Sequence, residues 1–174
     1  MDRLWSPWRY RYVSQEAPKE CIFCVKVSDT KDAQNFVLLR ARHNFALLNL
    51  YPYTTGHLMI APYQHVAALE DADPQTLEEM IRLARLAESS LRTVYQPRGF
   101  NIGMNIGECA GAGVAGHLHM HVLPRWPADV NFLTTIGETR VLPEDLPTTY
   151  CRLLEAFRRQ APGSGLDLQF PVAE

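Results

Sequence analysis

Short apolar segments separated by turn-forming residues follow one another early in the chain. Three such segments, rich in Phe, Leu, Val and Ile, span residues 36–39, 45–50 and 57–61. Polar residues, Pro52 and Gly56 interrupt them, which is the pattern of short β-strands joined by turns. We therefore expect three strands that form a meander.

A long helix is predicted to begin after residue 73. Asp73 and Pro74 fit the N-cap and the first helical position, where proline has no hydrogen bond to lose. Apolar residues then recur at spacings of three and four until Pro97 and Gly99 end the pattern. These apolar residues are Leu77, Met80, Ile81, Ala84, Ala87, Leu91 and Val94.

The later part of the chain adds two strands and one helix. The strands are expected over residues 100–106 and 117–123, and a shorter amphipathic helix over residues 150–157. The tail from Ala161 is rich in Pro and Gly and is expected to be a loop. Without repeats or interior linkers, five strands and two main helices predict one α+β domain over residues 1–174.

Residues 1–19 mix tryptophan, tyrosine and arginine without helical or strand periodicity. We expect an arm that lies against the body of the protein or a partner subunit, with a nucleic-acid arm as the alternative. The chain shows no apolar core of a secretion signal and no apolar stretch near the roughly 20 residues of a membrane span. These features predict a soluble, cytoplasmic protein with no membrane partner.

Charge and cysteine content narrow the function. With 17 Lys and Arg against 19 Asp and Glu, the formal net charge is −2, which argues against a broad basic surface for nucleic acid. Four cysteines are too few for a disulfide scaffold. Cys21-Ile-Phe-Cys24 has the spacing of a metal or redox pair, whereas Cys109 and Cys151 are expected to pack as apolar side chains.

Three of the six histidines alternate along one predicted strand. His117, His119 and His121 stand at i, i+2 and i+4, which composition alone would produce with a probability of about 0.007. Alternate side chains of a strand share a face, so we expect the three imidazoles on one side. The alternatives are hydrogen-bonded structural histidines and a catalytic zinc held by all three.

A glycine-rich segment leads directly into these histidines. Four glycines between residues 107 and 116 allow backbone N–H groups to converge on an anion. No Lys or Arg occurs between Arg98 and Arg125. Bound negative charge would therefore be met by amides and imidazolium, which suits a phosphate whose charge redistributes during reaction.

On these residues the chain resembles the histidine triad superfamily of nucleotide hydrolases and transferases. His117–Leu123 matches His-φ-His-φ-His-φ-φ, where φ is apolar, and Phe45–Asn49 followed by Gly56-His57 resembles the family's nucleoside-binding strands. The resemblance covers about residues 20–135. It implies a five-stranded antiparallel sheet and a homodimer, with a C-terminal helix and tail over residues 136–174.

A narrower similarity is to bacterial diadenosine tetraphosphate phosphorylases. It rests on Gly99–Gly103 and on Leu123–Trp126 followed by Asn131 and Phe132. Ala112-Gly113 and Ile106 stand where many dinucleoside hydrolases of the superfamily have glutamine or a hydroxyl residue. These departures argue against simple hydrolysis of a dinucleoside triphosphate.

The resemblance implies that His119 attacks the α-phosphate of an adenine dinucleoside polyphosphate and forms a nucleotidyl-histidine intermediate. A neutral imidazole is a competent nucleophile at cellular pH. His121 would hydrogen-bond a phosphate oxygen. The other nucleotide contacts carried over are Asn49 for the ribose and Asn105, Gly111, Gly113 and Val114 for the phosphate. The acceptor is left open between water, inorganic phosphate and another group, and a catalytically idle nucleotide-binding module is the alternative from another class.

A second group of residues has the chemistry of a zinc site. Zinc accepts two thiolates and two imidazoles in a closed tetrahedron, and the resemblance implies that Cys21, Cys24, His65 and His117 hold a structural zinc. The alternatives for the cysteine pair are redox activity and two buried thiols. The reaction requires no metal at the phosphate, although Mg²⁺ can accompany the substrate.

Overall fold

Five strands form one antiparallel sheet in the order β1-β2-β3-β5-β4. The computed structural model describes residues 20–127, 129, 134, 136 and 142–171. The predicted α+β fold with a five-stranded antiparallel sheet is confirmed. The predicted arm over residues 1–19 and the Asn131-Phe132 pair lie outside the described residues.

The strands are β1 (Val37–Arg40), β2 (Asn44–Leu48), β3 (Leu58–Pro62), β4 (Gly99–Met104) and β5 (Met120–Arg125). The helices are α2 (Ile22–Ser28), α3 (Pro74–Tyr95) and α5 (Leu146–Gln160), with 3-10 turns η1 (Leu69–Asp71), η2 (Glu108–Ala110) and η3 (Ala161–Gly163). The first three strands form the predicted meander, and β5 lies between β3 and β4.

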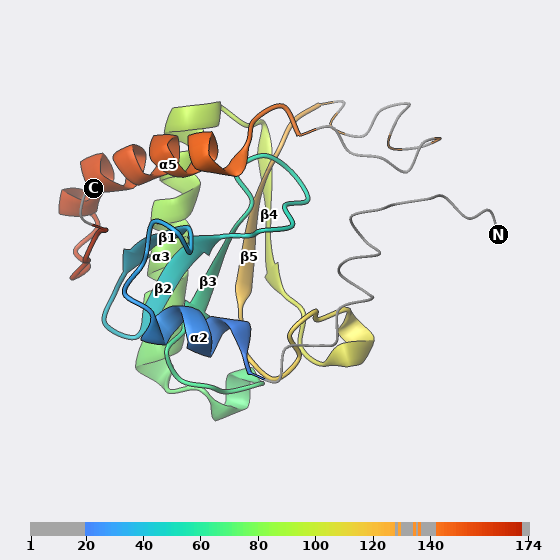
Figure 1. The fold of residues 1–174 in the computed structure, drawn as a ribbon, viewed down its shortest axis with the longest axis vertical. Coiled ribbons are helices and arrows are strands. Elements are labelled where there is room, and N and C mark those ends of the chain that lie inside the picture. Colours follow the sequence, from blue (N-terminus) through green and yellow to red (C-terminus); the bar gives the residue numbers. More distant parts are fainter. Residues whose placement is uncertain (1–19, 128, 130–133, 135, 137–141, 172–174) are drawn as a thin grey trace.

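The sheet is covered by different helices on its two faces (Figure 1). On one face, Leu58 and Ile60 of β3 belong to the core that α3 and α5 complete. On the other, Met59 and Ala61 pack in a smaller cluster with Phe23 of α2. This division follows from the alternation of side chains along a strand, and it places α2 on the histidine side of the sheet.

The helices differ from the prediction at two places. Helix α5 extends beyond the predicted residues 150–157 because Asp145 caps it by accepting the N–H of Thr148, with Pro147 in the first turn. Helix α2 was not predicted, because it has only seven residues and three of them are β-branched. Its packing against the sheet stabilises it instead.

The predicted strand over residues 117–123 begins later than expected. Strand β5 starts at Met120 and extends to Arg125, so His117 and His119 precede it. Beyond Met120, the partner strand ends at Pro62, which has no N–H for the ladder. The N–H of Leu118 instead donates to the carbonyl of Val66 at 2.7 Å.

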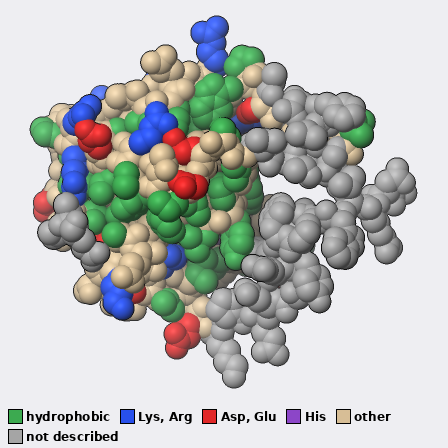
Figure 2. Space-filling view, turned by 45° about the horizontal axis from the view of Figure 1, so that its top comes forward, with side chains coloured by type: hydrophobic (Ala, Val, Ile, Leu, Met, Phe, Trp, Pro, Cys, Tyr) green, Lys and Arg blue, Asp and Glu red, His purple; other side chains and the backbone are tan. Residues whose placement is uncertain are grey.

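Charged side chains of both signs are interspersed with apolar ones on the face seen in Figure 2. On that face, no large area carries a single sign of charge. Among the described residues, no helix has the length and apolarity needed to cross a membrane.

Candidate active site and metal centre

Four side chains expected to bind zinc lie close together. The Nδ1 atom of His117 lies 3.3 Å from the Sγ of Cys21, 3.6 Å from the Sγ of Cys24 and 3.2 Å from the Nδ1 of His65. All four donor atoms fall within 4.8 Å of one another. Zinc–sulfur and zinc–nitrogen bonds of about 2.3 and 2.0 Å separate tetrahedral ligands by about 3.3–3.8 Å. The cluster therefore fits a zinc ion in both chemistry and size.

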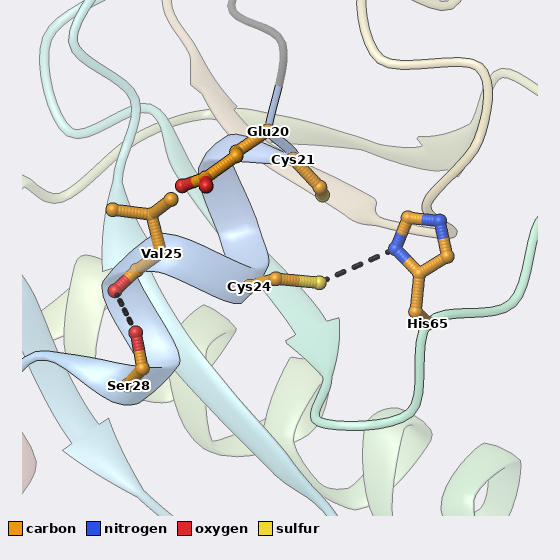
Figure 3. Close-up of a pocket in the computed structure, with 6 residues that line it drawn as sticks. All are labelled: Glu20, Cys21, Cys24, Val25, Ser28 and His65. Carbon is orange, nitrogen blue, oxygen red and sulfur yellow. Dashed lines mark hydrogen bonds between the residues drawn. The ribbon is translucent and has the colours of Figure 1, made fainter.

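Helix α2 positions the two cysteines. Cys21 is its N-cap and Cys24 lies three residues later, so both sulfurs project from the same side of its first turn. Figure 3 shows both cysteines pointing toward His65, which follows β3, while the Glu20 carboxylate points away. The cluster opens to a surface pocket that these residues line together with Val25 and Ser28.

The ring of His117 is oriented as a metal ligand requires. Its Nε2–H donates to the carbonyl of Pro62 at 2.9 Å, which leaves the lone pair on Nδ1, the atom that faces the cysteines. Burial lowers the pKa of His117, opposed by this hydrogen bond. The neutral imidazole is the form that coordinates a metal.

The ring of His119 presents the opposite nitrogen. Its Nδ1–H donates to the carbonyl of His117 at 2.8 Å, so the lone pair of the neutral ring lies on Nε2. Burial lowers the pKa of His119, and the same hydrogen bond raises it by less. His119 therefore carries an unprotonated, nucleophilic nitrogen at neutral pH.

Two further histidines form a chain of hydrogen bonds beside it. The backbone N–H of Tyr53 donates to Nδ1 of His57 at 3.1 Å, and Nε2 of His57 lies 2.9 Å from Nδ1 of His121. A ring nitrogen that accepts a hydrogen bond carries no proton, so the proton of neutral His57 is on Nε2. His57 therefore donates from Nε2 to His121. The remaining proton of His121 is then on its Nε2, from which it can be donated to a ligand.

Burial keeps these histidines neutral. Desolvation lowers the pKa of His57 to about 3, with smaller contributions from His121 and His119, and lowers that of His121 to about 4. Neutral rings are therefore favoured in the free protein, because burial disfavours the charged form of an imidazole. The imidazolium expected to meet a bound anion stays a prediction.

The other residues predicted to bind the nucleotide differ in whether their polar groups already have hydrogen-bond partners. The Nδ2 atom of Asn49 lies 3.3 Å from Nδ1 of His57, and Asn105 follows the end of β4. In the glycine-rich segment, the N–H of Gly111 already donates to the carbonyl of Glu108 at 2.9 Å. No backbone hydrogen bond to another described residue engages the amides of Gly113 and Val114.

The geometry also bears on the alternatives. A zinc held by all three histidines is not supported, because both ring nitrogens of His117 are engaged elsewhere: Nδ1 faces the cysteines and Nε2 contacts the carbonyl of Pro62. The prediction that Cys109 and Cys151 pack in the core is wrong, since both are exposed. Each stands on a solvent-facing position of a helical turn.

Two residues of the site were not singled out from the sequence. His57 was noted only within the Gly56-His57 pair, although its place as a polar residue at the start of the apolar segment 57–61 is a signal that could have identified it. Phe23 of α2 packs on the rings of both His117 and His119. Its only sequence signal is its position inside the Cys21–Cys24 pair.

Comparison with known proteins gives a consistent set of similarities. A model of the HIT domain matches residues 30–128. The chain is 36% identical over 168 residues to a Mycobacterium tuberculosis protein named AP-4-A phosphorylase, covering 92% of this chain and 86% of the relative. It is 32% identical over 93 residues to a Schizosaccharomyces pombe protein named bis(5'-nucleosyl)-tetraphosphatase (asymmetrical), covering 53% and 50%.

Solved structures show the same likeness. A zinc-bound histidine triad family protein from Mycobacterium smegmatis superimposes with a TM-score of 0.68 at 27% identity, over 83% of this chain and 97% of that one. The metal in that relative agrees with the cysteine and histidine cluster found in this chain.

Proposed function

This chain belongs to the HIT domain family, and we propose that it transfers a nucleotidyl group from a dinucleoside polyphosphate through a covalent bond to His119. Family membership follows from the domain match over residues 30–128. The names of the two relatives support a dinucleoside tetraphosphate as the substrate. The greater share of the chain matched by the phosphorylase favours inorganic phosphate as the acceptor.

The observation that carries this proposal is the lone pair on Nε2 of His119, held there by the hydrogen bond from Nδ1–H to the carbonyl of His117. In the first step Nε2 attacks the α-phosphorus, a P–N bond forms, and the bond to the bridging oxygen breaks with its electron pair on the leaving nucleotide. The positive charge that develops on the ring is stabilised by the same carbonyl. The Nε2–H of His121 donates to the departing or a nonbridging oxygen.

In the second step an oxygen of inorganic phosphate attacks phosphorus and the P–N bond returns its electron pair to Nε2. For diadenosine tetraphosphate the leaving nucleotide is ATP and the product of phosphate attack is ADP. Water as the acceptor would release AMP instead. No step consumes an oxidant or a metal-bound nucleophile, and Mg²⁺ would enter only with the polyphosphate.

The remaining residues would bind rather than react. We assign the ribose to Asn49 and the phosphate to Asn105 and the amides of Gly113 and Val114. The amide of Gly111 is already engaged and is therefore not assigned to the phosphate. Gly111 contributes instead through its left-handed backbone conformation, at φ 85°. That conformation favours glycine and keeps the segment clear of a Cβ atom.

We assign a structural zinc ion to Cys21, Cys24, His65 and His117. The Nδ1 lone pair of His117 and the spacing of the four donors support it. When bound, the metal supplies a rigid link between α2 and the segment that precedes β5. The reacting nitrogen belongs to His119, two residues after His117, so the link acts on its position.

The homodimer implied by the resemblance remains a proposal. Among the described strands, β4 forms one edge of the sheet and exposes Asn101, Ile102 and Gly103. An unpaired edge with an exposed apolar side chain is suited to pairing with a second copy. A mass measurement in solution by sedimentation tests it, and a monomer at micromolar concentration would contradict it.

Product analysis tests the proposed reaction. Diadenosine tetraphosphate is incubated with and without inorganic phosphate, and we expect ADP and ATP only when phosphate is present. Phosphate-independent AMP would identify a hydrolase. Rapid quenching with α-labelled substrate should yield an acid-labile, alkali-stable adduct on His119. Nucleotide binding without any turnover or adduct would indicate an idle binding module.

The variant His119→Gly tests the role of His119 as the nucleophile. We expect its turnover to fall by on the order of a thousandfold or more, because the covalent route is lost. Its affinity for the nucleotide should stay within about tenfold, since most contacts remain. Appreciable residual turnover would remove His119 from the nucleophilic role.

A further inference from the structure

The phenyl ring of Phe23 packs against two histidines of the site. Phe23 is 1% exposed and lies on α2 between the two cysteines of the cluster. Its ring centroid lies 5.1 Å from that of His117 and 4.9 Å from that of His119, with interplanar angles of 44° and 35°. The contacts are dispersion and ring–ring interactions, with no hydrogen bond. One buried ring therefore touches both a predicted metal ligand and the proposed nucleophile.

The His119 ring depends on packing for its orientation. Within the described part of the chain, a single hydrogen bond, from Nδ1–H to the carbonyl of His117, holds one atom of the ring. The ring of His121 meets it edge-on, with centroids 4.9 Å apart at 71°. Rotation about the hydrogen bond is limited by what lies on the face of the ring, and Phe23 is the aromatic side chain on that face. Displacing a reacting atom by about 1 Å can cost about a hundredfold in rate.

Helix α2, which carries Phe23, is held at both ends. At its start the cysteines belong to the four-residue cluster. At its end the guanidinium of Arg40 donates to three backbone carbonyls, those of Lys26, Val27 and Asp29, at 3.2, 3.1 and 2.8 Å. A helix of seven residues anchored at both ends keeps Phe23, its second residue, in a fixed place.

We propose that Phe23 is a positioning residue whose ring sets the orientation of the His119 imidazole and transmits to it the geometry of the cysteine and histidine cluster. The inference rests on the proposed role of His119 as nucleophile. It gives the aromatic residue inside the Cys21–Cys24 pair a function beyond filling the core. It also explains how a structural metal affects a reaction in which it takes no step.

The test compares Phe23→Leu with Phe157→Leu. Phe157 is 0% exposed in the main core, where α5 packs on the sheet, and serves as a matched loss of a buried ring. Both variants should lower the melting temperature. In Phe23→Leu alone, kcat should fall by about tenfold to a hundredfold with KM within about threefold. Zinc measured by atomic emission should remain at the wild-type stoichiometry.

A second measurement does not depend on the reaction. Long-range proton–nitrogen NMR spectra should show His119 as a single Nδ1–H tautomer in the wild type and as a mixture in Phe23→Leu. If the wild type formed no adduct on His119, the proposed function would fail while the tautomer comparison still tested Phe23. A single tautomer in both proteins, or a kcat within about twofold of wild type, overturns the inference.

Phe23→Met covers the case in which the leucine variant does not fold. Methionine fills most of the volume of the ring but has no flat face. We expect it to show the same loss of kcat and the same mixture of tautomers. Wild-type kcat in Phe23→Met would show that Phe23 only fills space. A rise in KM alone would place it in substrate binding and would equally contradict the proposal.

Discussion

The Nε2 atom of His57 lies 2.9 Å from the Nδ1 atom of His121, and this contact decides which nitrogen of His121 faces the proposed substrate site. Because Nδ1 of His57 accepts the N–H of Tyr53 at 3.1 Å, the proton of His57 is on Nε2. His121 is therefore held with its own proton on the outer nitrogen. One buried ring, one half-buried ring and one backbone amide thus set a donor in place without any charge.

Replacing His57 should impair the reaction without abolishing it. In His57→Phe, His121 loses its donor and can adopt either tautomer, so kcat should fall by about 10- to 100-fold. His57→Gln retains a side-chain N–H and should recover part of the loss. Steady-state kinetics check this, with His43→Phe, in the turn between β1 and β2, as the control. Equal kcat in His57→Phe and wild type would contradict the relay.

Stability should decrease as the pH falls below neutrality. Burial lowers the folded-state pKa of His57 to about 3 and that of His121 to about 4, from an ordinary value of 6.5. The unfolded chain therefore binds more protons between these values, so the contribution is complete above about pH 6.5 and is lost toward pH 3. We expect the free energy of unfolding to drop by several kcal/mol from pH 7 to pH 4.

Urea unfolding at the two pH values measures this difference. His57→Phe removes the group with the larger shift, so its pH dependence should be clearly weaker than that of the wild type. An unchanged difference between pH 7 and pH 4 in the variant would show that His57 is not the group responsible.

Removal of a cluster cysteine should release the metal. In Cys24→Ser the tetrahedral set loses one thiolate, so zinc content should fall and the melting temperature should decrease. Cobalt substitution of the wild type should give the charge-transfer absorption of thiolate coordination, and the variant should weaken it. Cys109→Ser is the matched control, because Cys109 is exposed and outside the cluster. Equal zinc content in all three proteins would refute the site.

Glu79 should matter for folding and not for catalysis. Its carboxylate, on α3, accepts the backbone N–H groups of Arg42, His43 and Asn44 at 3.2, 2.9 and 2.9 Å and ties the turn between β1 and β2 to the helix. Glu79→Gln weakens these charge-assisted bonds and should cost about 1–3 kcal/mol of unfolding free energy. Chemical denaturation tests it, and an unchanged kcat is expected at a temperature where the variant is folded. A stability equal to that of the wild type would show that the turn between β1 and β2 does not depend on the Glu79 carboxylate.

Local patterns determined much of this protein in advance. Apolar runs broken by turn residues and helical periodicity lie within single segments, so they predicted all five strands and the long helix after Asp73. The histidine alternation and the Cys21–Cys24 spacing are also local, and they predicted candidate reactive and metal-binding side chains before any fold was known. The short helix between residues 22 and 28 was missed because its stability comes from contacts with the sheet and not from its own residues.

Only the tertiary structure decided which atoms face one another. His65 and His117 are 52 residues apart, yet their Nδ1 atoms lie 3.2 Å apart. The tautomers of the histidines depend on carbonyls and amides contributed by other segments, and the position of Phe23 over His119 depends on how α2 packs. Residue types and their spacing carry chemical capacity, but protonation and orientation follow from neighbours that the chain brings together only when it folds.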